Sequence, residues 1–213
     1  MILTGHSHVN VNPTTRKPAR KASRRTARER VFRSASELFY RKGIRAVGVE
    51  TIAARANTTK MGLYRNFPSK DDLVAEWLRD HDAKFWQTWD SMSRQALDDP
   101  RKQLKAAFDL LAKHVADPKA RGCPMANAAV ELTEKDHPAR KVIEAHKAKL
   151  RARLAELCAQ TGAGDSALLA DQLFLLMEGA QVSAQMPGAR AAAANVARAA
   201  NALIETHIKT RKN

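Results

Sequence analysis

One short stretch, residues 49–70, constrains the fold more than any other part of the chain. Its first half places apolar side chains at positions i, i+3, i+4 and i+7, the pattern of one buried face of a two-turn helix. The members of this face are Val49, Ile52, Ala53 and Ala56. Asn57 follows, and asparagine tolerates the left-handed backbone conformation that a sharp turn needs. Because the alanines let another helix cross closely, the pattern predicts a helix, a tight turn and a second helix.

The residues after the turn predict a second short helix with an exposed polar surface. Thr59 has the position of an N-cap. Leu63 and Phe67 are four residues apart, so both side chains point into a core. Ser69 opens a capping box that predicts a further helix from Lys70, where a helix N-terminus and a lysine form a ready phosphate site. Two short helices of this kind have the geometry that enters a DNA major groove.

Together these motifs resemble those of the tetracycline-repressor (TetR) family of transcriptional regulators. The resemblance covers about residues 26–73. Its most specific part is the pattern Leu63-Tyr64-x-x-Phe67-x-Ser69-Lys70 behind Ile52-Ala53-x-x-Ala56. The resemblance implies an all-α fold, with an N-terminal three-helix helix-turn-helix DNA-binding domain and a C-terminal helical domain for dimerisation and effector binding. It also implies a homodimer, most often a repressor, that a small-molecule effector releases from a palindromic operator in double-stranded DNA.

Candidate DNA contacts follow from the resemblance and from the expected exposure of the second short helix. Tyr64 matches the family tyrosine that usually contacts the DNA backbone, and Lys70 matches the lysine at the next helix start. Thr59 and Lys60 occupy positions that commonly contact phosphates or base edges, and Arg65 lies beside them. The full set of predicted DNA-contacting residues is Thr51, Thr58, Thr59, Lys60, Met61, Gly62, Tyr64, Arg65, Asn66 and Lys70.

Three positions depart from the family pattern. Asn57-Thr58 replaces the usual Gly-Val, which the turn tolerates through the asparagine. Gly48 stands where a serine or threonine often caps the helix, so this cap is expected to be weaker. Met61-Gly62 occupies positions where small or hydroxyl residues are common, which predicts an unusual readout of bases there.

The charge of the chain favours a polyanionic partner. The formal net charge is +15 and the pI is about 10.3. Residues 1–25 form a basic arm that we expect to be disordered when free and to lie along phosphates or in a minor groove, although a solubilising tail has the same composition. Two alternatives therefore remain: a non-specific or architectural nucleic-acid binder, and a helical small-molecule-binding protein with incidental DNA contacts.

Other features bear on location and chemistry. Two cysteines do not make a disulfide framework, which favours a reducing cytoplasm. The sequence shows neither an apolar run that spans a bilayer nor a signal peptide, so we expect a soluble, cytoplasmic protein without a membrane partner. The seven histidines are scattered, and no phosphate loop or nucleophile elbow is present. We expect neither an enzyme nor a bound metal or other cofactor.

Helical patterns continue to the C-terminus. A helix is expected from about Ala27 to Lys42, and a long helix from Lys70 towards Leu97 joins the DNA-binding unit (residues 26–73) to the remainder (residues 74–213). No sustained alternation indicates a sheet. Prolines and glycines separate the later helical segments. These segments are residues 101–116, 124–133, 137–161, 165–185 and 189–209.

The last two segments predict a dimer surface. An apolar stripe on the first of them consists of Leu169, Leu173, Leu176 and Ala180, and the second is rich in alanine. Small residues allow the close helix approach of a two-fold four-helix interface. An ordinary core within one chain would show the same pattern.

Aromatic side chains on the long helix indicate an effector pocket, since such walls with a few polar groups suit small molecules. Plain core packing is the alternative. The predicted ligand-binding residues are Trp77, Phe85, Trp86, Trp89, Cys123, Asn127, Phe174, Glu178 and Gln181. Cys123 begins a helix close to Arg121, which predicts a lowered thiol pKa and, as an alternative function, a thiol-based redox sensor. A small buried residue fits that position too. Cys158 is expected in the core.

Overall fold

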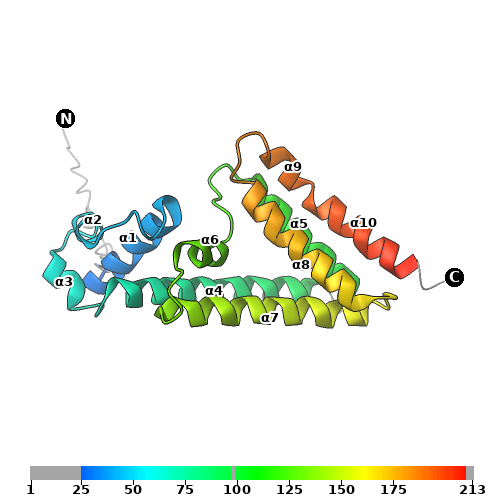
Figure 1. Ribbon diagram of the computed structural model, residues 1–213, viewed down its shortest axis with the longest axis horizontal. Coiled ribbons are helices and arrows are strands. Elements are labelled where there is room, and N and C mark those ends of the chain that lie inside the picture. The colour runs from blue at the N-terminus through cyan, green and yellow to red at the C-terminus, as the bar shows by residue number, and fades with distance from the viewer. Residues whose placement is uncertain (1–24, 97–98, 210–213) are drawn as a thin grey trace, which may run out of the picture.

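The computed structural model describes residues 25–96 and 99–209, and within them the regular structure is entirely helical, which confirms the predicted all-α fold. The basic arm lies outside the described residues apart from its last residue. Figure 1 shows α1–α3 grouped at one end of an elongated molecule and α4 running along its length. The helices are α1 (Ala27–Lys42), α2 (Val49–Arg55), α3 (Lys60–Tyr64), α4 (Lys70–Gln95), α5 (Pro100–Ala116), α6 (Pro124–Glu131), α7 (Pro138–Gln160), α8 (Ser166–Ser183), α9 (Arg190–Ala194) and α10 (Val196–Lys209).

The N-terminal unit forms around α1, which begins and ends where the sequence predicts. Thr26 and Glu29 make a capping box at its start, and the backbone N–H of Gly43 closes its end on the Phe39 carbonyl at 3.0 Å. The buried face of α1 meets α2, α3 and the first turns of α4. Trp77 of α4 belongs to this apolar core, as do Met125 of α6 and Ile143 of α7. The N-terminal unit (residues 26–73, called the reading unit below) is therefore packed directly against the C-terminal part of the chain.

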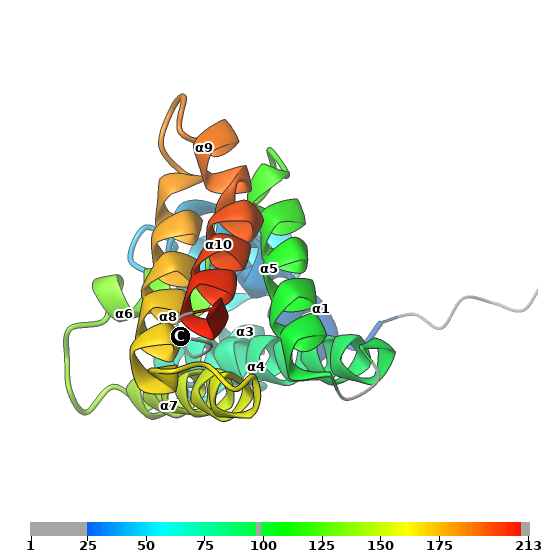
Figure 2. The ribbon, with the colours of Figure 1, turned by 90° about the vertical axis from the view of Figure 1, so that its right-hand side faces the viewer.

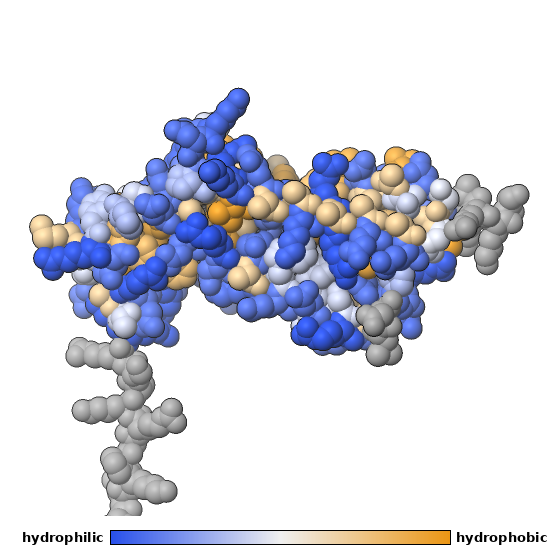
Figure 3. Space-filling model, turned by 90° about the horizontal axis from the view of Figure 1, so that it is seen from below, coloured by the Kyte–Doolittle hydropathy of each residue, from blue (hydrophilic) through white to orange (hydrophobic). Residues whose placement is uncertain are grey.

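The C-terminal part is a helical bundle. α4 and α7 lie side by side, and α5, α8 and α10 rise from one end of that pair (Figures 1 and 2). A second apolar core between these helices includes the fully buried Leu104, Phe108, Leu154 and Leu173. Seen from below, the surface is mostly hydrophilic and carries a narrow row of apolar residues (Figure 3). No helix among the described residues is long and apolar enough to cross a membrane.

The last predicted helix is interrupted. Instead of one helix over residues 189–209, the chain forms α9 and α10, separated at Asn195. The backbone N–H of Asn195 bonds the Ala192 carbonyl three residues earlier, at 3.0 Å, so the regular spacing of helical hydrogen bonds is lost there. Ala193 and Val196, on either side of the break, are both buried against the bundle.

The predicted dimer stripe on α8 needs correction. Leu169, Leu173 and Ala180 are buried within this chain, so for them the intrachain-core interpretation is the right one. The exposed apolar residues of α8 lie on another face. They are Leu168, Leu175 and Val182, spaced seven residues apart and 48%, 68% and 48% exposed.

Candidate DNA-binding surface and ligand cavity

The turn between α2 and α3 has the predicted geometry. Asn57 adopts a left-handed conformation with φ +51°, and the Thr59 hydroxyl accepts a hydrogen bond from the backbone N–H of Gly62 at 3.0 Å. Leu63 and Phe67 are buried and anchor α3 on the core. This anchoring fixes which side chains of the short helix face outward.

Six of the ten predicted DNA-contacting side chains are exposed on α2, α3 and their flanks. Met61 is 66% exposed and Tyr64 is 41% exposed, so both side chains are accessible to a partner. The six are Thr51, Thr59, Lys60, Met61, Tyr64 and Arg65. They provide hydroxyl, cationic, apolar and aromatic groups at one end of the molecule.

Lys60 is not a free cation in this structure. Its ammonium lies 2.8 Å from the Glu50 carboxylate of α2. The hydrogen bond between them raises the pKa of Lys60 and lowers that of Glu50. A phosphate that binds Lys60 has to compete with this carboxylate.

Three partly buried members of the predicted set have structural roles. A Cβ at Gly62 would lie 2.3 Å from the Thr58 hydroxyl oxygen, so glycine leaves the space that Thr58 occupies. The Asn66 amide donates to the Gly62 carbonyl at 2.8 Å. These contacts explain why Gly62 interrupts the polar surface of α3. DNA contact by the three residues stays a prediction.

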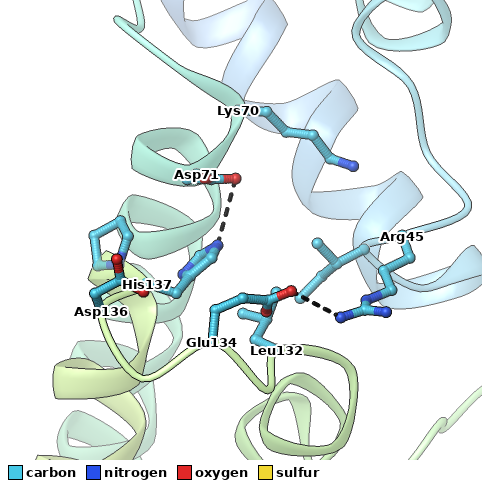
Figure 4. Close-up of a pocket in the computed structure, with 9 residues that line it drawn as sticks. Arg45, Lys70, Asp71, Leu132, Glu134, Asp136 and His137 are labelled. Carbon is cyan, nitrogen blue, oxygen red and sulfur yellow. Dashed lines mark hydrogen bonds and ion pairs between the residues drawn. The ribbon is translucent and has the colours of Figure 1, made fainter.

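Lys70 begins α4 as predicted, behind Ser69, whose hydroxyl accepts from the Asp72 backbone N–H at 2.9 Å. The lysine side chain lines a cleft between the N-terminal unit and the α6–α7 turn, together with Arg45, Glu134 and His137 (Figure 4). Partial burial lowers its pKa. Its phosphate contact also stays a prediction.

The same cleft contains polar contacts that sequence reasoning missed. The Arg45 guanidinium lies 3.1 Å from Glu134 (Figure 4). Beside the cleft, the Glu131 carboxylate accepts the Arg45 backbone N–H at 2.9 Å. A Cβ at Gly43 would lie 3.0 Å from Glu131, so the α1–α2 loop and the end of α6 are in close contact. The acidic composition of residues 131–136 was the only available signal.

A cavity of about 480 Å³ lies between α4, α5, α7 and α8. It is lined by five of the nine predicted ligand residues, namely Trp77, Phe85, Trp89, Cys123 and Gln181. The other four lie outside the lining. Trp86 donates to Asp82 at 2.9 Å, Asn127 donates to the Arg121 carbonyl at 2.7 Å, Phe174 packs under Arg151, and Glu178 pairs with Lys147 at 2.6 Å.

Sequence reasoning also missed polar residues of the lining, above all His81, His146 and Lys147. The His146 Nδ1 lies 2.7 Å from an Asp82 oxygen. These groups come from α4 and α7, and only the packing of those two helices brings them together. No group of three or more potential metal ligands occurs within the described ranges.

Comparison with known proteins shows the family. Residues 31–77 match the bacterial regulatory proteins of the tetR family, and residues 100–200 match the tetracyclin repressor-like C-terminal domain. A putative TetR transcriptional regulator from Streptomyces avermitilis MA-4680 is 30% identical, and its structure aligns over 86% of this chain and 98% of its own with a TM-score of 0.72. This chain belongs to the TetR family.

Two further relatives are also transcriptional regulators. The TetR-family regulator SCO4454 from Streptomyces coelicolor has a TM-score of 0.80 and 26% identity over 85% of this chain and 96% of its own. An uncharacterized HTH-type transcriptional regulator in the lacX 3′ region of Lactococcus lactis subsp. lactis is 29% identical over 143 residues, 65% of this chain and 71% of the relative. TetR proteins are transcription regulators and not enzymes.

In this TetR protein the pKa of the Cys123 thiol is shifted in the opposite direction to the one that the sequence predicts. Cys123 is buried, and burial raises its pKa, although the Lys147 ammonium lies 3.8 Å from its sulfur. The Arg121 guanidinium instead binds the Arg41 carbonyl. The expected lowering of the thiol pKa is therefore wrong, and with it the premise of a reactive thiolate. Cys158 is in the core as predicted, and burial raises its pKa to about 11.

His81, which lines the cavity, is expected to make the unfolding free energy of the TetR protein depend on pH. Burial, with His146 nearby, lowers the pKa of His81 to about 4, against an ordinary 6.5. As the pH falls, His81 is protonated in the unfolded chain before it is protonated in the folded chain. Its contribution to stability is therefore fully present above pH 6.5 and is lost as the pH falls towards 4. We expect the unfolding free energy to fall by about 2 kcal/mol between pH 7 and pH 5 from this group. Urea unfolding of wild type and His81→Phe at both pH values measures it, and an equal loss in both proteins contradicts the assignment.

Proposed function

We propose that this TetR regulator is a homodimeric repressor that binds a palindromic operator through α3 and leaves it when a small molecule fills the cavity. The observation that carries the proposal is the combination, in one chain, of an exposed α3 surface with an apolar cavity that is joined to it by close contacts. Effector binding favours one arrangement of the two reading units over another by its differential affinity for the two states.

Dimerisation is supported by the exposed face of α8. Leu168, Leu175 and Val182 form an apolar row along this helix, and the neighbouring α10 exposes small residues such as Ala199 and Ala202. Small side chains allow close helix approach, and a two-fold axis pairs such a face with itself. The dimer presents two copies of α3 to successive half-sites.

The segment between α5 and α7 provides the route from the cavity to the reading unit. Gly122 and Cys123 line the cavity beside Tyr40 of α1. The Tyr40 hydroxyl accepts the Arg121 backbone N–H at 2.7 Å. At the other end of α6, Glu131 holds the Arg45 backbone. A ligand that displaces this segment therefore changes the position of α1 relative to the C-terminal bundle.

Selection of bound fragments from genomic DNA tests the proposal. We expect recovery of a palindromic site that the protein prefers by about 10³-fold or more over random DNA. Sedimentation of the free protein and of its complex gives the stoichiometry, which we expect to be one dimer per site. Equal affinity for random and selected DNA would instead support the non-specific architectural alternative.

The contact between Glu131 and the α1–α2 loop gives a separate prediction. Glu131→Ala removes the acceptor of the Arg45 backbone N–H, and loss of such a bond costs about 1 kcal/mol. We expect exchange of the Arg45 amide hydrogen to accelerate about 5-fold, and operator affinity to fall about 3- to 10-fold because the reading unit is held less firmly. Glu134→Ala is the matched control, because its ion pair is exposed on both sides. Equal effects of the two changes would contradict this role of Glu131.

A further inference from the structure

The size and walls of the cavity favour a flat aromatic occupant. Its volume of about 480 Å³ is that of a site for a drug-sized molecule. Indole and phenyl rings from three turns of α4, those of Trp77, Phe85 and Trp89, form one wall, and Leu111, Leu150 and Met177 close the others. Aromatic faces stack on flat ring systems, and thioether and leucine side chains adapt to them.

The charges at the cavity cancel within the protein. Among the described lining residues the lysines are Lys84 and Lys147. Lys84 lies 2.7 Å from Asp80, and both oxygens of Glu178 lie within 2.7 Å of the Lys147 ammonium. A carboxylate ligand would have to separate one of these pairs, and a cationic ligand would meet no unpaired carboxylate. Burying an unpaired charge here is unfavourable, so the lining selects against ions.

Within the described part of the chain, the unpartnered polar groups of the lining include the buried Trp89 Nε1 and the ring of His81. His81 makes no hydrogen bond there, although it is largely enclosed. Burial lowers its pKa to about 4, so the ring is neutral near pH 7 and presents one N–H donor and one nitrogen acceptor. By contrast, His146 already uses its Nδ1 with Asp82. A ligand hydroxyl or carbonyl would satisfy His81.

From these observations we infer that the effector is a neutral, flat, polycyclic aromatic molecule with a hydroxyl or carbonyl group that hydrogen-bonds His81. This inference rests on the proposed function for the role of the cavity, and it adds the chemical class of the ligand. The Trp89 Nε1 in the aromatic wall offers one further hydrogen-bond donor.

Four tricyclic probes with the same ring test the inference. They are phenanthrene, 9-phenanthrol, phenanthrene-9-carboxylate and 9-(aminomethyl)phenanthrene, titrated calorimetrically into the full chain at pH 7. We expect 9-phenanthrol to bind about 10-fold more tightly than phenanthrene, which is the value of one good hydrogen bond. Both ions are expected to bind at least about 30-fold more weakly than 9-phenanthrol.

His81→Phe keeps a ring at this position and removes its polar atoms. In this variant we expect 9-phenanthrol and phenanthrene to bind within about 2-fold of each other. His207→Phe is the control, because His207 bonds Gln172 at 3.0 Å and does not line the cavity. The control should keep the wild-type preference. A preference that survives in His81→Phe would overturn the role of His81.

Two results would overturn the ligand class: binding of an ion as tight as that of 9-phenanthrol, or no binding of any probe. Operator affinity, measured by fluorescence anisotropy with and without 9-phenanthrol, separates this inference from the proposed function. If 9-phenanthrol binds through His81 and the operator stays bound, the ligand class is supported and release by an effector is contradicted. If the DNA fragments show no preferred site, repression fails whatever the probes do.

Discussion

Tyr64→Ala is expected to weaken operator binding by about 30- to 1000-fold. The ring is 41% exposed on α3, directly beside the fully buried Leu63 that fixes the helix. A contact of this kind contributes about 1–2 kcal/mol, and a dimer makes it twice, which gives about 2–4 kcal/mol in total. Fluorescence anisotropy with the selected operator at one fixed salt concentration measures the loss.

Two further variants make this result specific. Tyr64→Phe removes only the hydroxyl, and we expect a loss of about 3- to 10-fold from a missing phosphate hydrogen bond. Arg94→Ala removes an exposed cation near the far end of α4, and we expect operator affinity within about 2-fold of wild type. If Tyr64→Ala stays within about 3-fold of wild type as well, α3 is not the reading helix.

Gly122→Ala is expected to destabilise the folded chain by about 2–4 kcal/mol, which lowers the melting temperature by about 5–15 °C. Gly122 has φ +66°, where a side chain is strained. A Cβ would also lie 2.8 Å from the Gln181 carbonyl oxygen, which belongs to the backbone of α8. The loop that begins α6 would have to move away from α8.

Gly164→Ala is the matched control for this effect. A Cβ there would meet the His207 carbonyl oxygen only at an ordinary 3.9 Å, and the backbone has no positive φ. We expect a change within about 0.5 kcal/mol. Thermal unfolding of both variants by circular dichroism gives the comparison, and similar melting temperatures would contradict the strain at Gly122.

Local signals in the sequence predict the reading unit well. Asn57 in the turn and the caps at Thr59 and Ser69 act over three or four residues, so their effect depends little on the rest of the chain. The buried faces of α1 and α3 follow from helical spacing in the same way. These features set both the positions of the helices and the residues that α3 exposes.

Contacts between distant segments could not be predicted in this way. The bond from Arg45 to Glu131 joins residues 86 positions apart, and no spacing rule relates them. For Leu169 and Leu173, the pattern fits a core or a dimer surface, and the packing of α8 against α7, α10 and α5 decides between them. Cys123 shows the same limit, because burial outweighs the helix start and the nearby lysine in setting its pKa.

The pairing of Lys60 with Glu50 has a consequence for how the protein searches DNA. A chain with a net charge of +15 is attracted to every phosphate it meets. Because the Lys60 ammonium is already paired with Glu50, we expect this lysine to contribute little to binding at a DNA site chosen at random. We propose that a site which holds a phosphate against α3 draws the lysine away from this carboxylate. On this proposal, Glu50 weakens non-specific binding along DNA more than it weakens binding to an operator.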